Sequence, residues 1–270
     1  MEDKLQSVGF RKRFQEAYPW IVAPLIVGAP MRVMSGPELA VAVSSAGGFG
    51  FIGPGLKPES TAVDLETAKG LVAASGIHQS GSVLPVGVGF QIWNGNLDVS
   101  ATAVSQYRPA AVWLFAPRNG QSDVDVWTKR LREASPETKI WLQIGTLREA
   151  LDAVRSASAP DVLVVQGAEA GGHGRTSDGA GFITLLPEIA DATRGSGIPL
   201  VAAGGVADGR GHSGRSHGAS QERALGYQAG DGRRRNTVRT HLYIFAARSL
   251  AEQFTRAPSP ELGGAQAARI

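Results

Sequence analysis

The chain has 270 residues, of which 43% are hydrophobic and 19% are charged, a composition typical of one globular α/β domain. It contains no cysteine, which excludes disulfides, thiol catalysis and cysteine-based metal sites. Residues 211–270 carry nine arginines and four acidic residues, so the net charge of +3 originates there and gives no reason to expect nucleic acid as a partner of the rest.

The first twenty residues mix both charge signs and lack the apolar core of a secretory signal. No stretch contains the roughly 18 consecutive apolar residues that a membrane span needs. We therefore expect a soluble, cytoplasmic protein with an N-terminal extension over residues 1–19 and no membrane partner.

From residue 20 onward, short apolar runs alternate with amphipathic stretches. The runs cover residues 20–28, 48–53, 84–90, 110–116, 139–145, 161–167 and 198–205, and their continuous apolar character is typical of parallel strands buried on both faces. Helices are predicted after Ser35, a possible N-cap, and over about 59–74, 97–106, 122–134, 146–157 and 180–194. Thr146 and Glu149 have the spacing of a capping box.

Repeated strand–helix units predict a parallel sheet. We favour a TIM-type (β/α)8 barrel over a doubly wound sheet, because the first strand–helix turn lacks the Gly-x-Gly-x-x-Gly pattern of dinucleotide-binding folds. The repeats stop near residue 210, and no eighth strand and helix are recognisable beyond it. The predicted organisation is therefore a barrel over 20–210 whose eighth strand is missing or disrupted, followed by an atypical, Arg-rich tail over 211–270.

The strongest functional signal is QGAEAGGHG (residues 166–174), directly after the sixth predicted strand. Ligands of parallel α/β folds bind at the carboxyl ends of the strands, and adjacent glycines such as Gly171 and Gly172 let backbone amides approach a ligand closely. His173 follows them, and an imidazole with a near-neutral pKa suits proton transfer. A glycine-rich turn with a surface histidine is the alternative interpretation, which the position after a buried strand disfavours.

A second signal, LVAAGGVADG (residues 200–209), follows the seventh predicted strand. A strand, the pair Gly204 and Gly205, and a helix start predict a phosphate site built from backbone amides, without indicating which phosphate ligand. Gln143 and Gln166 end the fifth and sixth strands and would add amides to the same mouth, although a glutamine bonded to backbone explains each one equally well. The turn Ala29-Pro30-Met31 after the first strand is a weaker signal of the same kind.

Together these motifs resemble the nitronate monooxygenases, formerly called 2-nitropropane dioxygenases, and look like their eukaryotic, fungal branch. The similarity covers about residues 20–211 and is most specific in QGAEAGGHG. It implies FMN across the barrel mouth, no metal, and His173 at the catalytic position. The implied FMN contacts are Ala29, Pro30, Met31, Gln143, Gln166, Gly171, Gly172, Ala203, Gly204 and Gly205.

The activity that the resemblance implies is the oxidation of alkyl nitronates by O₂ to carbonyl compounds and nitrite. FMN would carry the redox chemistry, and the protein would supply orientation and electrostatics. His173 would take the α-proton of a neutral nitroalkane or hold the anionic nitronate. The expected partners are therefore small molecules and O₂.

Residues from 212 onward depart from the family, whose members continue with an alanine-rich helix and a strand ending in Gly-Thr-Arg. Codons compatible with the residues after Gly211, read one nucleotide later, can encode a similar helix and Gly-Thr-Arg in that order. This pattern indicates a frameshift or an altered splice junction near Gly211. Because a barrel without its eighth strand exposes two strand edges, we expect weak FMN binding or poor folding.

Three other functions fit parts of the sequence. A flavin-dependent enoyl reductase of a related barrel family would share the AGGH sequence and consume NAD(P)H. A vestigial, non-catalytic flavin-binding protein would fit the altered C-terminal part. Nucleic-acid binding through the Arg-rich tail is disfavoured, because aromatic residues are sparse there and no recognition motif is present.

Overall fold

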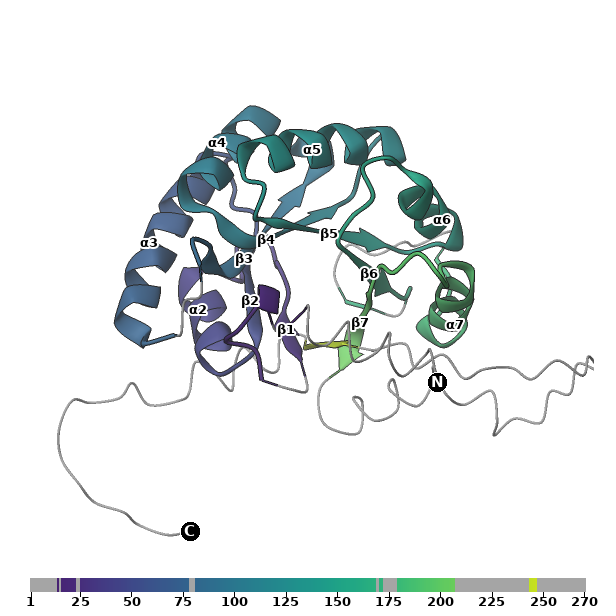
Figure 1. Cartoon of the computed structure of the whole chain (residues 1–270), viewed down its shortest axis with the longest axis horizontal. Coiled ribbons are helices and arrows are strands. Elements are labelled where there is room, and N and C mark those ends of the chain that lie inside the picture. The colour runs from purple at the N-terminus through teal and green to yellow at the C-terminus, as the bar shows by residue number, and fades with distance from the viewer. Residues whose placement is uncertain are drawn as a thin grey trace, which may run out of the picture.

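The structure is a computed structural model that describes residues 14, 16–22, 25–77, 81–168, 170–171, 179–206 and 243–246, with 205–206 and 243–246 described by backbone alone. Within these residues, eight parallel strands close a barrel in chain order. Figure 1 shows helices α2 to α7 as an outer arc around the strands. The prediction of a parallel (β/α) barrel is confirmed.

The elements follow one another as strand and helix along the chain. The strands are β1 (Ile26–Gly28), β2 (Phe49–Ile52), β3 (Leu84–Gln91), β4 (Pro109–Phe115), β5 (Lys139–Ile144), β6 (Val162–Gln166), β7 (Leu200–Val206) and β8 (Tyr243–Ala246). The helices are α2 (Pro37–Ser45), α3 (Ser60–Ser75), η1 (Ile92–Asn94), α4 (Leu97–Tyr107), α5 (Gln121–Ala134), α6 (Leu147–Arg155) and α7 (Phe182–Ala192).

Strand β8 differs from the expectation of a missing or disrupted eighth strand. It pairs in parallel with β1, where Phe245 lies beside Val27, and with β7, where Ile244 lies beside Ala202. In Figure 1 it is the yellow strand between β7 and β1. The barrel thus draws one strand from residues 211–270, while the expected frameshift at Gly211 falls outside the described residues.

Strand β3 shows why the strand sequences lack polar alternation. Val86, Val88 and Phe90 pack in the layer between the strands and the helices. The residues between them are glycines, and a Cβ at Gly87 would lie 2.2 Å from the ring of Phe51 in the barrel interior. Both faces are therefore buried, as in other closed parallel sheets.

Below the mouth, the barrel interior is filled by aromatic side chains. Phe49, Phe51, Trp113 and Trp141 are each at most 1% exposed. Phe51 packs against Trp113 at 5.2 Å between ring centroids, and Trp113 stacks on Trp141 at 6.0 Å. The interior is a packed core, as is usual for this fold, so a ligand has room only at an end of the barrel.

The segment before β1 packs against this aromatic core. Tyr18, from the predicted N-terminal extension, is 2% exposed, and its hydroxyl accepts a hydrogen bond from Nε1 of Trp141 at 3.1 Å. Burial raises the pKa of the Tyr18 hydroxyl, so this group stays neutral. The aromatic ring of Phe14 lies 4.7 Å from that of Tyr18.

Two local predictions are wrong. The first strand was expected to begin at residue 20, but β1 has three residues, because Trp20 and Val22 donate hydrogen bonds to Gly48 and Gly47 just before β2. Ser35 does not cap α2, whose N-cap is Gly36. By contrast, the capping box of α6 is confirmed, with Thr146 as N-cap.

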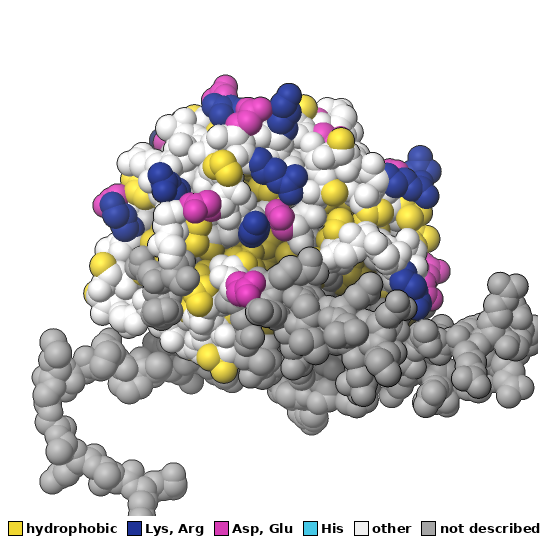
Figure 2. All heavy atoms as spheres, in the orientation of Figure 1, with side chains coloured by type: hydrophobic (Ala, Val, Ile, Leu, Met, Phe, Trp, Pro, Cys, Tyr) yellow, Lys and Arg dark blue, Asp and Glu magenta, His cyan; other side chains and the backbone are white. Residues whose placement is uncertain are grey.

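The described surface carries charges of both signs side by side over the helices (Figure 2). The face shown in Figure 2 thus has no extended patch of lysine and arginine side chains of the kind that binds a nucleic-acid backbone. None of the helices in the described part of the chain combines the length and apolar character that crossing a bilayer requires.

Candidate functional site at the carboxyl ends of the strands

The carboxyl ends of β5, β6 and β7 bring several predicted site residues to one edge of the barrel. Gln143 lies beside Val164, and Gln166 lies beside Ala203. Ala203 is buried, and both glutamines are half-buried. Because the strands are parallel and adjacent, their last residues meet at the barrel mouth.

Hydrogen bonds between side chains link the two glutamines to the aromatic core. Nε1 of Trp113 donates to Oε1 of Gln143 at 3.0 Å, and Nε2 of Gln143 donates to Oε1 of Gln166. Both glutamines were predicted at the mouth, whereas Trp113 was not. Its only sequence signal is an indole three residues before the end of the apolar run 110–116.

The two glycine motifs meet at this edge. Gly204 has a φ of +92°, and a Cβ on it would lie 2.3 Å from Cβ of Ala170 in the QGAEAGGHG segment. The N–H of Ala168 donates to the carbonyl of Ala180 at 3.0 Å, which ties together the two ends of the loop after β6. A Cβ on Gly171 would meet nothing within 4 Å among the described residues.

For three of the predicted site residues, the structure describes the backbone alone or nothing. Gly205 is placed by its backbone in β7. Gly172 and His173 lie outside the described residues, as does the helix start predicted after Gly205. The roles of Gly172 and His173 therefore stay predictions.

The turn after β1, residues 29–31, also lies at the carboxyl ends of the strands. Pro30 fits against β3, since a Cβ on Gly89 would lie 2.2 Å from Cβ of Pro30. The hydroxyl of Ser35 accepts from the N–H of Met31 at 2.8 Å and donates to its carbonyl at 3.2 Å. The side chain of Met31 is half-buried and packs against the aromatic core. Ala29, just after β1, is 8% exposed.

The loop after β4 is held by Asp123. Its Oδ2 accepts hydrogen bonds from the backbone N–H groups of Asn119 at 2.7 Å and Arg118 at 3.0 Å. Hydrogen bonds from Asn119 are the main cause of the lowered pKa of the Asp123 carboxyl.

No cluster of three or more metal-ligating side chains occurs in the described portion.

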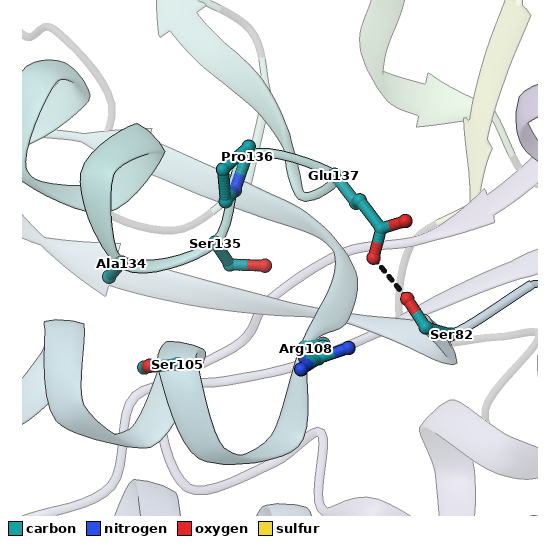
Figure 3. A pocket seen from close by; sticks show the side chains of 7 residues that line it. All are labelled: Ser82, Ser105, Arg108, Ala134, Ser135, Pro136 and Glu137. Carbon is teal, nitrogen blue, oxygen red and sulfur yellow. Dashed lines mark hydrogen bonds between the residues drawn. The ribbon is translucent and has the colours of Figure 1, made fainter.

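A separate hollow lies at the opposite end of the barrel (Figure 3). It has a volume of about 390 Å³ and is lined by Ser82, Ser105, Arg108, Ala134, Ser135, Pro136 and Glu137. Ser82 donates a hydrogen bond to Glu137, and Ser82, Arg108 and Glu137 lie one or two residues before β3, β4 and β5. Because barrel enzymes carry their chemistry at the carboxyl ends of the strands, this hollow is not the candidate site.

Sequence comparisons identify a family for this chain. The family model described as nitronate monooxygenase matches residues 103–219. The chain is 52% identical over 254 residues to nitronate monooxygenase npaC of Metarhizium robertsii, an alignment that covers 86% of this chain and 71% of that protein. It is 32% identical over 216 residues to a nitronate monooxygenase of Neurospora crassa, covering 72% of this chain and 56% of that protein.

Solved structures with the same fold include two at similar sequence identity. FabK of Thermotoga maritima matches with a TM-score of 0.58 and 26% identity, over 75% of this chain and 57% of that one. Nitroalkane oxidase of Streptomyces ansochromogenes matches with a TM-score of 0.52 and 27% identity, over 69% of this chain and 60% of that one. The chain thus spans less than two thirds of the length of either protein.

Proposed function

Because this chain belongs to the nitronate monooxygenase family, we propose that it binds FMN at the barrel mouth and oxidises alkyl nitronates with O₂ to carbonyl compounds and nitrite. The observation that carries the proposal is the meeting of the two glycine motifs beside a pair of amides, through the contact of Gly204 with Ala170. The partners are then a small nitronate or nitroalkane and O₂.

The residues at the mouth suit a flavin mononucleotide in chemical type. Amides such as those of Gln143 and Gln166 match the donor and acceptor atoms along the edge of a flavin ring. Glycine backbone at Gly171 and Gly204 suits a phosphate, since N–H groups without a neighbouring Cβ can approach an anion closely. Bound FMN would supply the redox chemistry, while these residues bind and orient it.

The proton step is assigned to His173 by family resemblance. A neutral nitroalkane must lose its α-proton before it becomes a nitronate, and an imidazole is suited to accept that proton near neutral pH. A His173→Asn variant should keep FMN but lose turnover of neutral nitroalkanes more than turnover of preformed nitronates. Unchanged turnover of both substrates would remove His173 from the mechanism.

The proposal is tested with the purified full-length chain. Its absorbance is recorded with and without added FMN, and the released flavin is identified by chromatography. Oxygen uptake with nitrite release from ethyl nitronate is the expected activity. No flavin binding, or flavin binding without this activity, would contradict the proposal.

The same assays distinguish the proposed activity from a second hypothesis, that of a flavin-dependent enoyl reductase. The structural match to FabK motivates a test with an enoyl thioester and NAD(P)H. Consumption of NAD(P)H by this substrate, without oxygen uptake on nitronate, would indicate a flavin-dependent reductase. A flavin spectrum without turnover of either substrate would indicate a non-catalytic flavin-binding protein.

A cytoplasmic location is also proposed. The sequence contains no cysteine, which suits a reducing compartment such as the cytoplasm. Subcellular fractionation with antibodies against the full chain tests this point, and recovery in a membrane or secreted fraction would contradict it.

A further inference from the structure

We infer that Trp113 is a positioning residue that turns Gln166 into a hydrogen-bond donor toward the flavin site. The inference rests on the proposed function, because the group that receives the hydrogen bond is the proposed FMN. It concerns a residue below the mouth that acts through two others.

The direction of the hydrogen bonds follows from the chemistry of the indole. Trp Nε1–H can only donate, so the atom of Gln143 that it meets at 3.0 Å has to be the amide oxygen. The nitrogen of Gln143 is then turned toward Gln166 and meets its oxygen. The NH₂ group of Gln166 is then the last donor in this chain of hydrogen bonds, and it is the group that can donate to a bound flavin.

Packing holds the indole in this orientation. Trp113 is 1% exposed, stacks on Trp141 with an interplanar angle of 27°, and meets the ring of Phe51 edge-on at 5.2 Å. A ring enclosed in this way cannot rotate without displacing its neighbours. The aromatic core thus sets the polarity of an amide at the barrel mouth.

This polarity has a chemical consequence for a bound flavin. Reduction adds electron density to the ring, and a donor that faces an acceptor atom of the ring stabilises the added charge. With its polarity reversed, Gln166 would present an oxygen and oppose the same change. Trp113 is therefore expected to strengthen FMN binding and to raise the flavin reduction potential.

The test compares Trp113→Phe with Trp141→Phe as a matched control. Each variant loses one buried indole and one hydrogen bond, but the partner of Trp141 is Tyr18, in the segment before β1. The dissociation constant for FMN is measured by fluorescence titration, the midpoint potential by dye equilibration, and stability by urea unfolding. Folding losses should be similar in the two variants.

The expected result separates the two variants by their flavin properties. Trp113→Phe should weaken FMN binding by about three- to tenfold, the equivalent of one neutral hydrogen bond, and lower the midpoint potential. Trp141→Phe should leave both quantities unchanged. Equal changes in the two variants, or an unchanged potential in Trp113→Phe, would overturn the inference.

A second variant keeps the inference testable if Trp113→Phe does not fold. Gln143→Met is uncharged and similar in size, but it can neither accept from Trp113 nor donate to Gln166, so the polarity of Gln166 is no longer set by the indole. FMN binding and midpoint potential should both fall, and unchanged values would refute the inference. Absence of FMN binding by the unaltered protein would refute the proposed function as well, which distinguishes the two failures.

Discussion

Replacement of Gly204 by alanine tests whether the contact between the two glycine motifs holds the barrel mouth together. Gly204 has a φ of +92°, and its missing Cβ would lie 2.3 Å from Cβ of Ala170. The change therefore introduces backbone strain and a steric clash at the same position. Gly204 is also a predicted FMN contact, so stability and flavin binding should change together.

The size of the effect follows from these two terms. A non-glycine residue in a sparsely populated backbone region costs about 1–3 kcal/mol. Carbon atoms pack best at about 3.5–4.0 Å, so the two Cβ atoms would have to separate by more than ~1 Å, and overpacking of this kind costs about 1–3 kcal/mol. The free energy of unfolding should fall by about 2–6 kcal/mol, out of a typical total of about 5–15 kcal/mol.

Urea unfolding followed by circular dichroism measures this loss, and FMN titration measures the effect on the site. Ala170→Gly in the Gly204→Ala background should recover the steric part but not the backbone part, roughly half of the loss. Gly171→Ala serves as the stability control, since its Cβ meets no described atom within 4 Å. If Gly204→Ala is as stable as the unaltered chain to within about 0.5 kcal/mol, the contact does not exist as described.

Three further changes test the surrounding structure. Gly70→Ala in α3, where a Cβ meets nothing within 4 Å, should raise the free energy of unfolding by about 0.5–1 kcal/mol in urea titrations. Thr128→Val should raise it by about 1 kcal/mol, because the buried Thr128 hydroxyl finds no hydrogen-bond partner among the described residues; a loss of stability would indicate a missed partner. Asp123→Asn should destabilise the protein at neutral pH, and the difference should vanish as acid protonates Asp123. The sign follows because the pKa of the Asp123 carboxyl is lower in the folded than in the unfolded protein: its contribution to the free energy of unfolding is present above the unfolded pKa and is lost as pH falls through the folded pKa. A difference between the two proteins that does not depend on pH would contradict this.

The strand–helix alternation was predictable because each unit carries its own signals. Helices α4 and α5 begin and end within one residue of the prediction, since apolar periodicity is a local property. The limits of β1 were not, because Trp20 and Val22 are held by hydrogen bonds to residues more than twenty positions away. Strand β8 was missed because the stretch that follows residue 210 shows neither a helical nor a strand period, so no strand–helix unit marks its position.

Part of the candidate site was also predictable. Gln143 and Gln166 end neighbouring strands, and strand order alone places both at the mouth. The role of Trp113 was not, because it depends on how β4 and β5 are aligned and on which side chains fill the interior between them. The contact between Gly204 and Ala170 likewise depends on tertiary packing that neither motif reveals alone.

The late position of β8 in the chain has a consequence for biosynthesis. The 36 residues 207–242 separate the end of β7 from the start of β8, and at about 5–20 residues per second a ribosome takes about 2–7 seconds to add them. Until β8 has been made and pairs with them, β1 and β7 have unpaired edges that can pair with strands of other chains. The yield of native protein should therefore depend on translation speed and on chaperones that shield the nascent sheet.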